Sequence, residues 1–278
     1  MEKVSIYIPA HNVERTIKEV LNSIFSQTIK FDEVIVINDS SDDQTLNILN
    51  EFNNIKIINN KKNMGLSYCR NLGLQLSKNN FVASIDGDVV LDQFWLEKIL
   101  TKFNDKIVMC GGNMIEKNLE NKFNKWRSVY YSQNWGDKDI RNPSFLFGCN
   151  TIQKKDSCKI VGGYDEKLKT NGEDVDYCNK LKDKGFDMYY CHEAKCYHLQ
   201  NDDSISLSNR IWRYHSYGYK VKKPSFYRFI KLVIKQLKFF LSRSFENLLK
   251  FNLTFISINT SILINFIKLE FQNINKKN

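Results

Sequence analysis

The sequence has few of the residues that break a chain or staple it covalently. Only 3 of its 278 residues are proline and 12 are glycine, while 42% are hydrophobic, which excludes collagen-like and linker-rich chains. The seven cysteines are odd in number and scattered, so they do not indicate a disulfide framework and favour reduced thiols in the cytoplasm. The opening residues, MEKVSIYIPA, have no apolar signal-peptide core, and we expect no signal peptide.

Two widespread nucleotide-binding signatures are also missing. Neither a P-loop nor a G-x-G-x-x-G run occurs, so an ordinary ATPase or a Rossmann dehydrogenase has no support from its main motif. The length is sufficient for one large α/β domain with an appendage or for two small domains.

The net charge of +10 is concentrated at the C-terminal end. From Lys220 onward, twelve Lys and Arg residues stand against two acids, Glu246 and Glu270, and this stretch accounts for the whole excess. We therefore predict a neutral domain over residues 1–219 and a separate basic, helical tail over residues 220–278.

Residues 1–104 alternate between short apolar runs and amphipathic segments. Strand-like runs lie at 4–9, 32–39, 55–60 and 81–88, and helix-like segments lie at 13–27, 41–52, 65–78 and 92–103. This alternation predicts an α/β fold with a mostly parallel sheet and flanking helices, in which ligands bind at the carboxyl ends of the strands. Residues 105–219 are less regular, with mixed strands, long loops and a helix from about 173 to 184.

Aspartates follow two of the expected strands. Asp86 and Asp88 come after the run FVASI with only Gly87 between them, and two like charges at a strand end need a cation or a raised pKa. A hard divalent cation that also binds nucleotide phosphates is one interpretation, and a solvated turn is the other. Asp39 ends a second run, where it either caps the next helix or contributes to the same ligand site.

Two more segments carry candidate functional groups. KKNMGLSYCRNLG (61–73) combines a glycine at a helix start with basic side chains, which suits an anion or a solvated face. In NGEDVDY (171–177), Glu173 and Asp174 begin a helix, either because acids favour a helix N-terminus or because one of them acts as a general base.

A cluster of potential metal ligands lies near residue 195. Cys191, His192, Cys196 and His198 do not match the usual paired spacing of zinc ligands. We therefore interpret His198 as a single ligand to a metal that is held mainly by carboxylates.

Taken together, these segments resemble the family 2 glycosyltransferases. VSIYIPAHNVERTIKEVLNSIFSQT is similar to the family's first strand and helix, DEVIVINDSSDDQT to its second strand and acidic turn, and NMGLSYCRNLGL to its Asn-x-Gly…Arg-Asn-x-Gly segment. DGD fits the metal-binding DxD, and FGCNTIQKKDSCKIVGGYDEKLKTNGEDVDYCNKLKDKG is similar to the acceptor-side segment. The likeness covers residues 3–200 and implies the nucleotide-sugar-binding, glycosyltransferase A-type fold, with a nucleotide-binding half (1–104) and an acceptor-side half (105–219).

The resemblance also implies a role for each matching residue. It places Pro9, Asn12, Asp39, Asn63, Arg70 and Asp86 at the nucleotide sugar, Gly148, Asn150 and Glu173 on the acceptor side, Asp88 and His198 on a metal, and Asp174 as general base. Asp39 would accept a hydrogen bond from a pyrimidine, Asp86 would lie near the ribose, and Asp88 would ligate Mn²⁺ or Mg²⁺ on the diphosphate.

The implied activity is inverting transfer of a sugar from a nucleoside-diphosphate sugar, with a UDP-sugar favoured, to a hydroxyl of a glycan or lipid-linked acceptor. The alternatives are transfer to polyprenyl phosphate, a sugar nucleotidyltransferase and an inactive binding module. PAHNVERT is not the glycine-rich basic loop that a nucleotidyltransferase needs, and four retained aspartates argue against an inactive module. The chain departs from the family pattern at His11, at Asn38-Asp39-Ser40 and at Gly87. These departures make the nucleotide base of the preferred donor harder to predict.

The basic tail contains an amphipathic pattern. In FYRFIKLVIKQLKFFL (226–241), Arg228, Lys231, Lys235 and Lys238 fall on one helical face opposite aromatic and aliphatic residues. The pattern predicts a helix that lies in the interface of an anionic membrane or packs on the catalytic domain, and its large apolar face argues against nucleic acid.

A second uncharged segment follows at residues 251–267. Seven of its seventeen residues are polar, which is too many for a membrane span, so we expect another interfacial or packed helix. We therefore expect a cytoplasmic protein that is peripherally associated with the inner face of the cell membrane.

Overall fold

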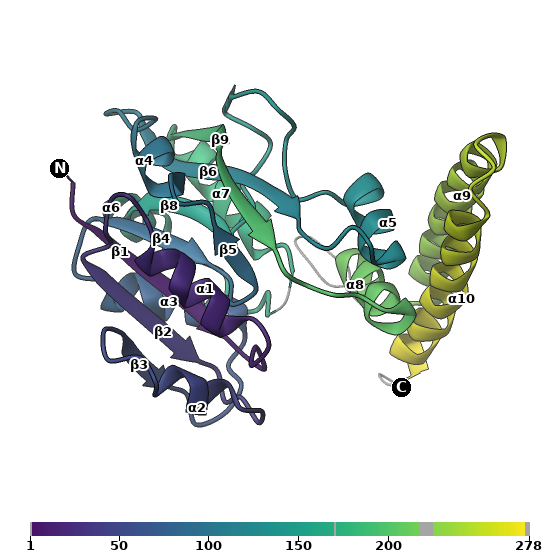
Figure 1. The fold of residues 1–278 in the computed structure, drawn as a ribbon. Helices are drawn as coiled ribbons and strands as arrows, with labels where there is room; N and C mark the ends of the chain where they lie inside the picture. The colour runs from purple at the N-terminus through teal and green to yellow at the C-terminus, as the bar shows by residue number, and fades with distance from the viewer. Residues whose placement is uncertain (1, 170, 217–224, 276–278) are drawn as a thin grey trace. The chain divides into compact units, whose positions relative to one another are not determined.

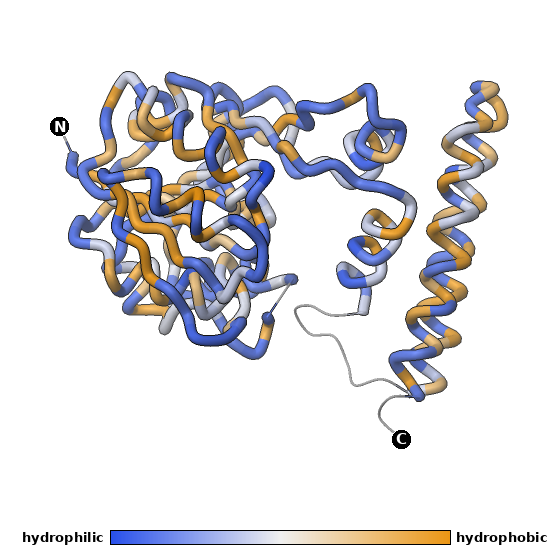
Figure 2. Tube along the Cα trace, turned by 60° about the horizontal axis from the view of Figure 1, so that its bottom comes forward, coloured by the Kyte–Doolittle hydropathy of each residue, from blue (hydrophilic) through white to orange (hydrophobic). Residues whose placement is uncertain are grey.

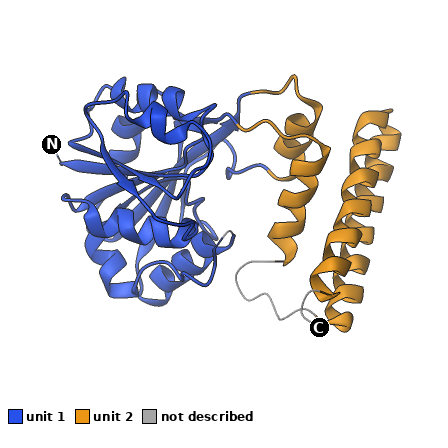
Figure 3. Ribbon diagram, turned by 90° about the horizontal axis from the view of Figure 1, so that it is seen from below, with its two compact units in different colours: residues 1–117, 132–199 blue, residues 118–131, 200–278 orange. Residues whose placement is uncertain are grey.

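The computed structural model describes residues 2–169, 171–216 and 225–275. The chain forms two compact units, which Figure 3 draws in different colours. The first is Met1–Lys117 with Ser132–Leu199, and the second is Asn118–Tyr131 with Gln200–Asn278. Five basic residues of the expected tail lie outside the described residues: Lys220, Lys222, Lys223, Lys276 and Lys277.

The first unit combines strands and helices (Figure 1). Its strands are β1 (Val4–Ala10), β2 (Glu33–Asn38), β3 (Lys56–Asn59), β4 (Phe81–Ile85), β5 (Val89–Leu91), β6 (Ile107–Glu116), β7 (Ile140–Arg141), β8 (Asn150–Lys154) and β9 (Asp187–His198). Its helices are α1 (Ile17–Phe25), α2 (Thr45–Leu49), α3 (Leu66–Leu76), α4 (Trp95–Leu100), α6 (Lys155–Val161) and α7 (Glu173–Asp183). β1 to β4 and α1 to α4 lie at the segments that the sequence pattern predicts, whereas β5 falls between the predicted strand at 81–88 and the predicted helix at 92–103.

One sheet organises this unit. Among the described residues it has nine strands, in the order β3-β2-β1-β4-β8-β6-β9-β5, with β7 paired to β9. β3, β2, β1 and β4 are parallel, whereas β8 runs antiparallel to both β4 and β6, and β9 is parallel to β6. The predicted α/β class with a central sheet and flanking helices is confirmed, and the less regular half of the sequence supplies the mixed part of the sheet.

Both faces of the sheet are covered by apolar side chains. β1 is buried at every position, which explains why its sequence is a continuous apolar run rather than an alternating one. Ile6 and Ile8 belong to a cluster that includes the buried face of α1, whereas Tyr7 between them packs with Cys69 and Leu74 of α3. Figure 2 shows hydrophobic, orange stretches within this unit between hydrophilic, blue ones.

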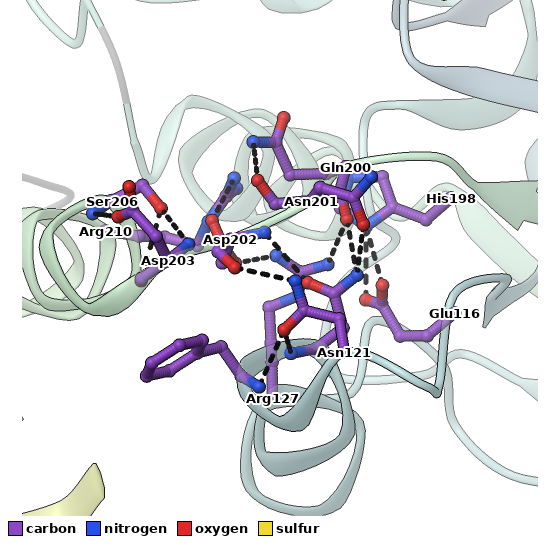
Figure 4. Close-up of polar contacts among 12 residues, drawn as sticks. Glu116, Asn121, Arg127, His198, Gln200, Asn201, Asp202, Asp203, Ser206 and Arg210 are labelled. Atoms are coloured by element: carbon purple, nitrogen blue, oxygen red, sulfur yellow. Dashed lines mark hydrogen bonds and ion pairs between the residues drawn. The ribbon is translucent and has the colours of Figure 1, made fainter.

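The second unit is helical. It comprises α5 (Lys122–Tyr130), α8 (Ser204–Ser216), α9 (Phe226–Leu249) and α10 (Leu253–Asn275). Trp126 of α5 lies in its core with Leu207 of α8 and Phe240 of α9. Arg127 and Asp202 form a buried ion pair in the same unit (Figure 4).

The second unit begins earlier in the chain than the expected tail. α5 and α8 belong to it although both precede residue 219, because their apolar side chains pack with those of α9 and α10. The expected boundary between residues 219 and 220 falls outside the described residues and stays a prediction.

α9 carries the predicted basic face, with one change. Lys231, Lys235 and Lys238 are exposed, but the side chain of Arg228 is only 11% exposed and lies 3.5 Å from the carboxylate of Glu270 in α10. Arg228 therefore fastens α9 to α10 and adds little to the exposed charge.

α10 is long and apolar enough to cross a membrane by length and composition, with 33% of its most apolar window buried. This criterion is weak on its own, because the core helix of a soluble protein meets it too. Asn259 and Glu270 of α10 are fully buried, and both form side-chain hydrogen bonds within the second unit, Asn259 with Trp126 at 2.8 Å and Glu270 with Ser216 at 2.6 Å. These contacts favour the packed helix that the sequence allowed.

The contact between α3 and β1 generates a stability prediction. A Cβ on Gly73 would lie 2.3 Å from the ring of Tyr7, which is fully buried. Gly73→Ala is therefore expected to lower the free energy of unfolding by about 1–3 kcal/mol through overpacking, although alanine is the better helix former. Urea denaturation measures this, with Gln75→Ala at an exposed position of α3 as the control. An unchanged or higher urea midpoint for Gly73→Ala would contradict the packing.

Candidate active site

The carboxyl ends of three parallel strands meet at one edge of the sheet. β1, β2 and β4 end at Ala10, Asn38 and Ile85, and they are neighbours in the order β2-β1-β4. Asp39 and Asp86 directly follow two of these ends, as the sequence predicts. This is the edge at which sheets of this kind bind ligands.

The carboxylate of Asp39 is buried and fixes the start of α3. It accepts hydrogen bonds from Asn60 Nδ2 at 2.7 Å, from the backbone N–H of Met64 at 2.9 Å and from that of Gly65 at 2.9 Å. The alternative that Asp39 caps the next helix is wrong, because α2 begins after Gln44. Its contact with a pyrimidine stays a prediction.

The other residues predicted on the nucleotide side lie around this edge. Asn12 has φ 55° and exchanges hydrogen bonds with Asp42 at 2.6 and 3.0 Å, which holds the turn after β1. Pro9 is buried in β1 opposite Ile37, and Asn63 is exposed. Their proximity to a nucleotide remains a prediction.

Arg70 of α3 joins two carboxylates from distant parts of the chain. Its guanidinium donates to Asp86 Oδ1 at 3.1 Å and to Glu173 Oε1 at 2.5 Å, and its side chain is only 2% exposed. The Tyr164 ring lies 5.7 Å from the same guanidinium. We call Arg70, Asp86, Glu173 and the adjacent Asp174 the Arg70 cluster.

Gly148 leaves the space that this arrangement requires. A Cβ at this position would lie 2.2 Å from Arg70 Nη1, closer than two such atoms can approach. The backbone N–H of Gly148 also donates to Asp174 Oδ2 at 3.4 Å. The structure thus brings together three residues that the sequence assigned to the acceptor side or to catalysis: Gly148, Glu173 and Asp174.

Burial raises the pKa of each carboxyl in the Arg70 cluster. The pKa of Glu173 rises to about 7, first because of its burial and then because of Asp174 nearby, while Arg70 opposes the rise. The pKa values of Asp174 and Asp86 are also raised by burial and held down in part by Arg70. One guanidinium facing three carboxyls therefore favours a state in which the cluster keeps a proton.

Asn150 is placed differently from the other acceptor-side candidates. It lies in β8 opposite Ile85, it is 1% exposed, and its Oδ1 accepts a hydrogen bond from Trp95 Nε1 at 2.7 Å. This contact is structural, and a role of Asn150 toward an acceptor stays a prediction.

The side chains of Asp88 and His198 lie beside each other in the first unit. His198 Nε2 is 3.3 Å from Asp88 Oδ2. On the other side of the ring, His198 Nδ1 is 3.1 Å from Glu116 Oε1 (Figure 4). Burial lowers the pKa of His198, but the carboxylates of Asp88 and Glu116 outweigh it and raise the pKa overall. A carboxylate behind a histidine orients the ring and makes its other nitrogen a better ligand.

These residues fit a cation that takes its remaining ligands from a substrate. Within the described ranges, no group of three or more His, Cys, Asp and Glu side chains is arranged to hold a metal by itself. Asp88 and His198 offer one oxygen-bearing and one nitrogen-bearing ligand at the site, and Mg²⁺ or Mn²⁺ commonly completes its shell with phosphate oxygens and water.

The remaining members of the Cys/His segment do not join this site. Cys191 and Cys196 are buried in the apolar core, and His192 Nδ1 lies 2.7 Å from Asp139. These residues therefore have contacts of their own, and the role of His198 as a single metal ligand stays a prediction.

Two contacts attach the segment before Asp174 to the start of α3. The backbone N–H of Leu66 donates to the carbonyl of Lys169 at 3.1 Å, and the Ser67 hydroxyl donates to the carbonyl of Leu168. Asp39, which follows β2, accepts a hydrogen bond from the N–H of Gly65. The start of α3 therefore contacts both the end of β2 and the segment that leads to Asp174.

Glu116 and Tyr164 are the functional neighbours that the sequence analysis missed. Glu116 ends a buried strand, the same signal that drew attention to Asp86, and a consistent use of that signal would have found it. Tyr164 stands in the segment GGYDE, where nothing local indicates that its ring meets Arg70.

Known proteins are similar to this chain in sequence and in fold. The family model "Glycosyl transferase family 2" matches residues 5–161. The minor teichoic acid biosynthesis protein GgaB of Bacillus subtilis is 29% identical over 237 residues, 76% of this chain and 25% of GgaB. The UDP-Glc:alpha-D-GlcNAc-diphosphoundecaprenol beta-1,3-glucosyltransferase WfaP of Escherichia coli is 37% identical over 109 residues, 38% of this chain and 41% of WfaP.

Two solved structures share the fold. The S. aureus TarS 1–349 structure in complex with UDP-GlcNAc has a TM-score of 0.61 at 20% identity and covers 84% of this chain and 66% of its own. The Pyrobaculum calidifontis mannosyltransferase PcManGT in complex with GDP-Man and Mn²⁺ has a TM-score of 0.63 at 14% identity and covers 97% and 87%. These likenesses place the first unit among the glycosyltransferase A-type folds.

The chain spans much less than two thirds of the two curated relatives, 25% of GgaB and 41% of WfaP. The family model nevertheless matches more than half of the chain, over the strands and helices that build the sheet edge and Asp88. The chain therefore belongs to glycosyl transferase family 2.

Proposed function

We propose that this protein transfers a sugar, with inversion, from a nucleoside-diphosphate sugar to a hydroxyl of a glycan or lipid-linked acceptor. Family membership supports glycosyl transfer, and the UDP-GlcNAc complex of TarS supports a UDP-sugar as the favoured donor. The printed name of WfaP, whose acceptor is a GlcNAc-diphosphoundecaprenol, supports a lipid-linked sugar as acceptor. Such an acceptor lies at a membrane surface, which agrees with the peripheral membrane location expected from the basic tail.

The observation that carries this proposal is the Arg70 cluster. Arg70 holds Asp86, which follows a nucleotide-side strand, and Glu173, which precedes the predicted base. A donor bound at the strand edge and an acceptor hydroxyl at Asp174 would therefore meet in one fixed geometry, which is the condition for a direct displacement.

Asp174 is the better general base of the two adjacent carboxyls. Glu173 Oε1 is engaged by Arg70, and Glu173 is 4% exposed, so a substrate has little access to it. Asp174 is half-buried, and burial raises its pKa, which makes its carboxylate a stronger base near neutral pH. It would take the acceptor hydroxyl proton as the oxygen bonds to the anomeric carbon and the bond from that carbon to the diphosphate oxygen breaks.

The bond electrons leave with the diphosphate, so negative charge develops there. A divalent cation held by Asp88 and His198 would supply the positive charge that stabilises it. Glu116 would hold the His198 ring in place, and Asp39, Asn12 and their neighbours would orient the nucleotide.

The base assignment predicts the effect of one amide substitution. Asp174→Asn is expected to lower turnover by about 10²–10⁴-fold, because it removes the proton acceptor, and to leave donor binding unchanged. UDP release with a synthetic GlcNAc-diphospholipid acceptor measures turnover, and a thermal-shift assay measures donor binding. Asp183→Asn at the exposed end of α7 is the control. Wild-type turnover of this hydroxyl acceptor by Asp174→Asn would exclude Asp174 as the base.

The metal assignment predicts a loss of metal-dependent donor binding. With Mn²⁺ present, a UDP-sugar at a hundredfold excess over its Kd is expected to raise the unfolding midpoint by about 5–10 °C. Asp88→Asn is expected to remove the difference between Mn²⁺ and EDTA, whereas Asp105→Asn at an exposed site keeps it. An undiminished Mn²⁺ effect in Asp88→Asn would contradict the assignment. UDP-, GDP- and CMP-sugars in parallel identify the base.

The raised pKa of Glu173 predicts a pH dependence of stability. Its pKa is 4.5 ordinarily and about 7 in the folded protein, so the folded state binds the proton more tightly. The stability that this proton contributes is present below pH 4.5 and is lost as the pH rises toward 7, by at most about 1.4 kcal/mol per pH unit. Glu173→Gln removes this loss, so its stability relative to wild type is expected to rise between pH 5 and 7. Urea midpoints at each pH measure this, with exposed Glu120→Gln as the control. A stability difference between Glu173→Gln and wild type that does not change with pH would contradict the raised pKa of Glu173.

A further inference from the structure

An apolar stripe runs along the outside of α9. Its members recur at spacings of three, four or seven residues, which places them on one helical face. Tyr227, Leu241 and Phe245 are 78%, 65% and 63% exposed. The α9 stripe consists of Tyr227, Ile230, Ile234, Leu241, Phe245 and Leu248, all of them exposed.

Two of the three fully buried residues of α9 are polar. The buried residues of this helix are Gln236, Phe240 and Asn247, and Asn247 Nδ2 donates to the Tyr130 hydroxyl at 2.6 Å. A helix that packs only within a soluble unit turns its apolar residues inward. α9 packs Phe240 and partly buries Phe239 in this way, but it also leaves the α9 stripe exposed, so this second apolar face is suited to a second apolar environment.

Exposed lysines lie beside the stripe. Lys231, Lys235 and Lys238 line a groove of about 460 Å³ together with Leu232 and Ile234. Among the described residues no acidic side chain pairs with any of the three lysines. A row of lysines without acidic partners beside an apolar strip is complementary to a membrane surface, in which anionic headgroups lie over an apolar layer.

α10 cannot serve this role without breaking the second unit. Glu270 is 0% exposed and accepts hydrogen bonds from Trp212 Nε1 at 2.9 Å and from Ser216 at 2.6 Å. Insertion of α10 into lipid would remove these partners and carry a carboxyl into hydrocarbon. α10 also exposes Leu253, Ile264 and Phe271, but the helix that can enter a lipid surface without losing these hydrogen bonds is α9.

We propose that the α9 stripe docks in the plane of an anionic phospholipid bilayer. Its aromatic and aliphatic side chains enter the boundary between headgroups and acyl chains, and Lys231, Lys235 and Lys238 contact the headgroup phosphates. The proposal deepens the membrane location in the proposed function, but vesicle binding requires no glycosyl transfer. Asp174→Asn is therefore expected to bind vesicles like the wild type, so the two proposals fail separately.

Vesicle flotation with the full chain tests this surface. The probes are vesicles of phosphatidylcholine alone and of an equimolar mixture with phosphatidylglycerol. Wild type is expected to bind the anionic vesicles, more weakly when NaCl rises from about 0.1 M to about 0.5 M. Lys231→Gln with Lys238→Gln is expected to weaken binding about 25-fold, at about five-fold for each lysine, and Ile234→Asn with Leu241→Asn at least about tenfold.

Matched controls separate the stripe from general surface effects. Lys125→Gln and Ile205→Asn change an exposed lysine and an exposed isoleucine elsewhere in the second unit and are expected to bind like wild type. Wild-type binding by the Ile234→Asn, Leu241→Asn variant, or equal binding of wild type to both kinds of vesicle, would overturn the proposal. So would a wild-type dimer in light scattering that the α9 variants dissociate without any vesicle binding, because a second copy would then occupy the stripe.

Discussion

The buried guanidinium of Arg70 is the contact on which the geometry of the candidate active site depends. It joins α3 to the end of β4 and to the start of α7, and Glu173 lies 103 residues away in sequence. A buried charge that loses a partner costs about 3–5 kcal/mol, so these segments are held together strongly. A lysine would not replace it, because one ammonium lacks the planar fork that reaches two carboxylates at once, and Gly148 provides the space for that fork.

The ion pairs of Arg70 also explain why several acidic side chains lie together at the edge of a buried core. One guanidinium faces Asp86, Glu173 and Asp174, and burial raises the pKa of all three carboxyls. Such a cluster is relieved by a proton on one carboxyl or by a cation nearby, and Asp88 stands two residues from Asp86. The two aspartates after β4 thus divide their contacts, with Asp86 on Arg70 and Asp88 beside His198.

Local sequence patterns were sufficient for the parallel half of the fold and for the place of Asp39, Asp86 and Asp88 after strand ends. A strand buried on both faces reads as an apolar run, and Asp86 and Asp88 follow such a run directly. Contacts across long separations were not accessible in this way. Glu116 contacts His198, which lies 82 residues away in sequence, and Gly148 leaves space for Arg70. A pattern within a short stretch of sequence does not reveal either pairing. The contacts of Asp39 were missed for the same reason, because its partners lie in a loop more than 20 residues away.

The helical unit shows a different limit of sequence patterns. An amphipathic period in α9 predicts two unlike faces, but periodicity alone does not say which face is buried. In α9, Phe240 packs with Trp126 in the core of the unit, and the polar Gln236 and Asn247 are buried as well. A second apolar face, the α9 stripe, is left outside, next to three lysines without acidic partners among the described residues. Packing inside the unit and attraction to an anionic surface thus use different faces of one helix, so a helix that packs within its own unit can still present an apolar face to a membrane.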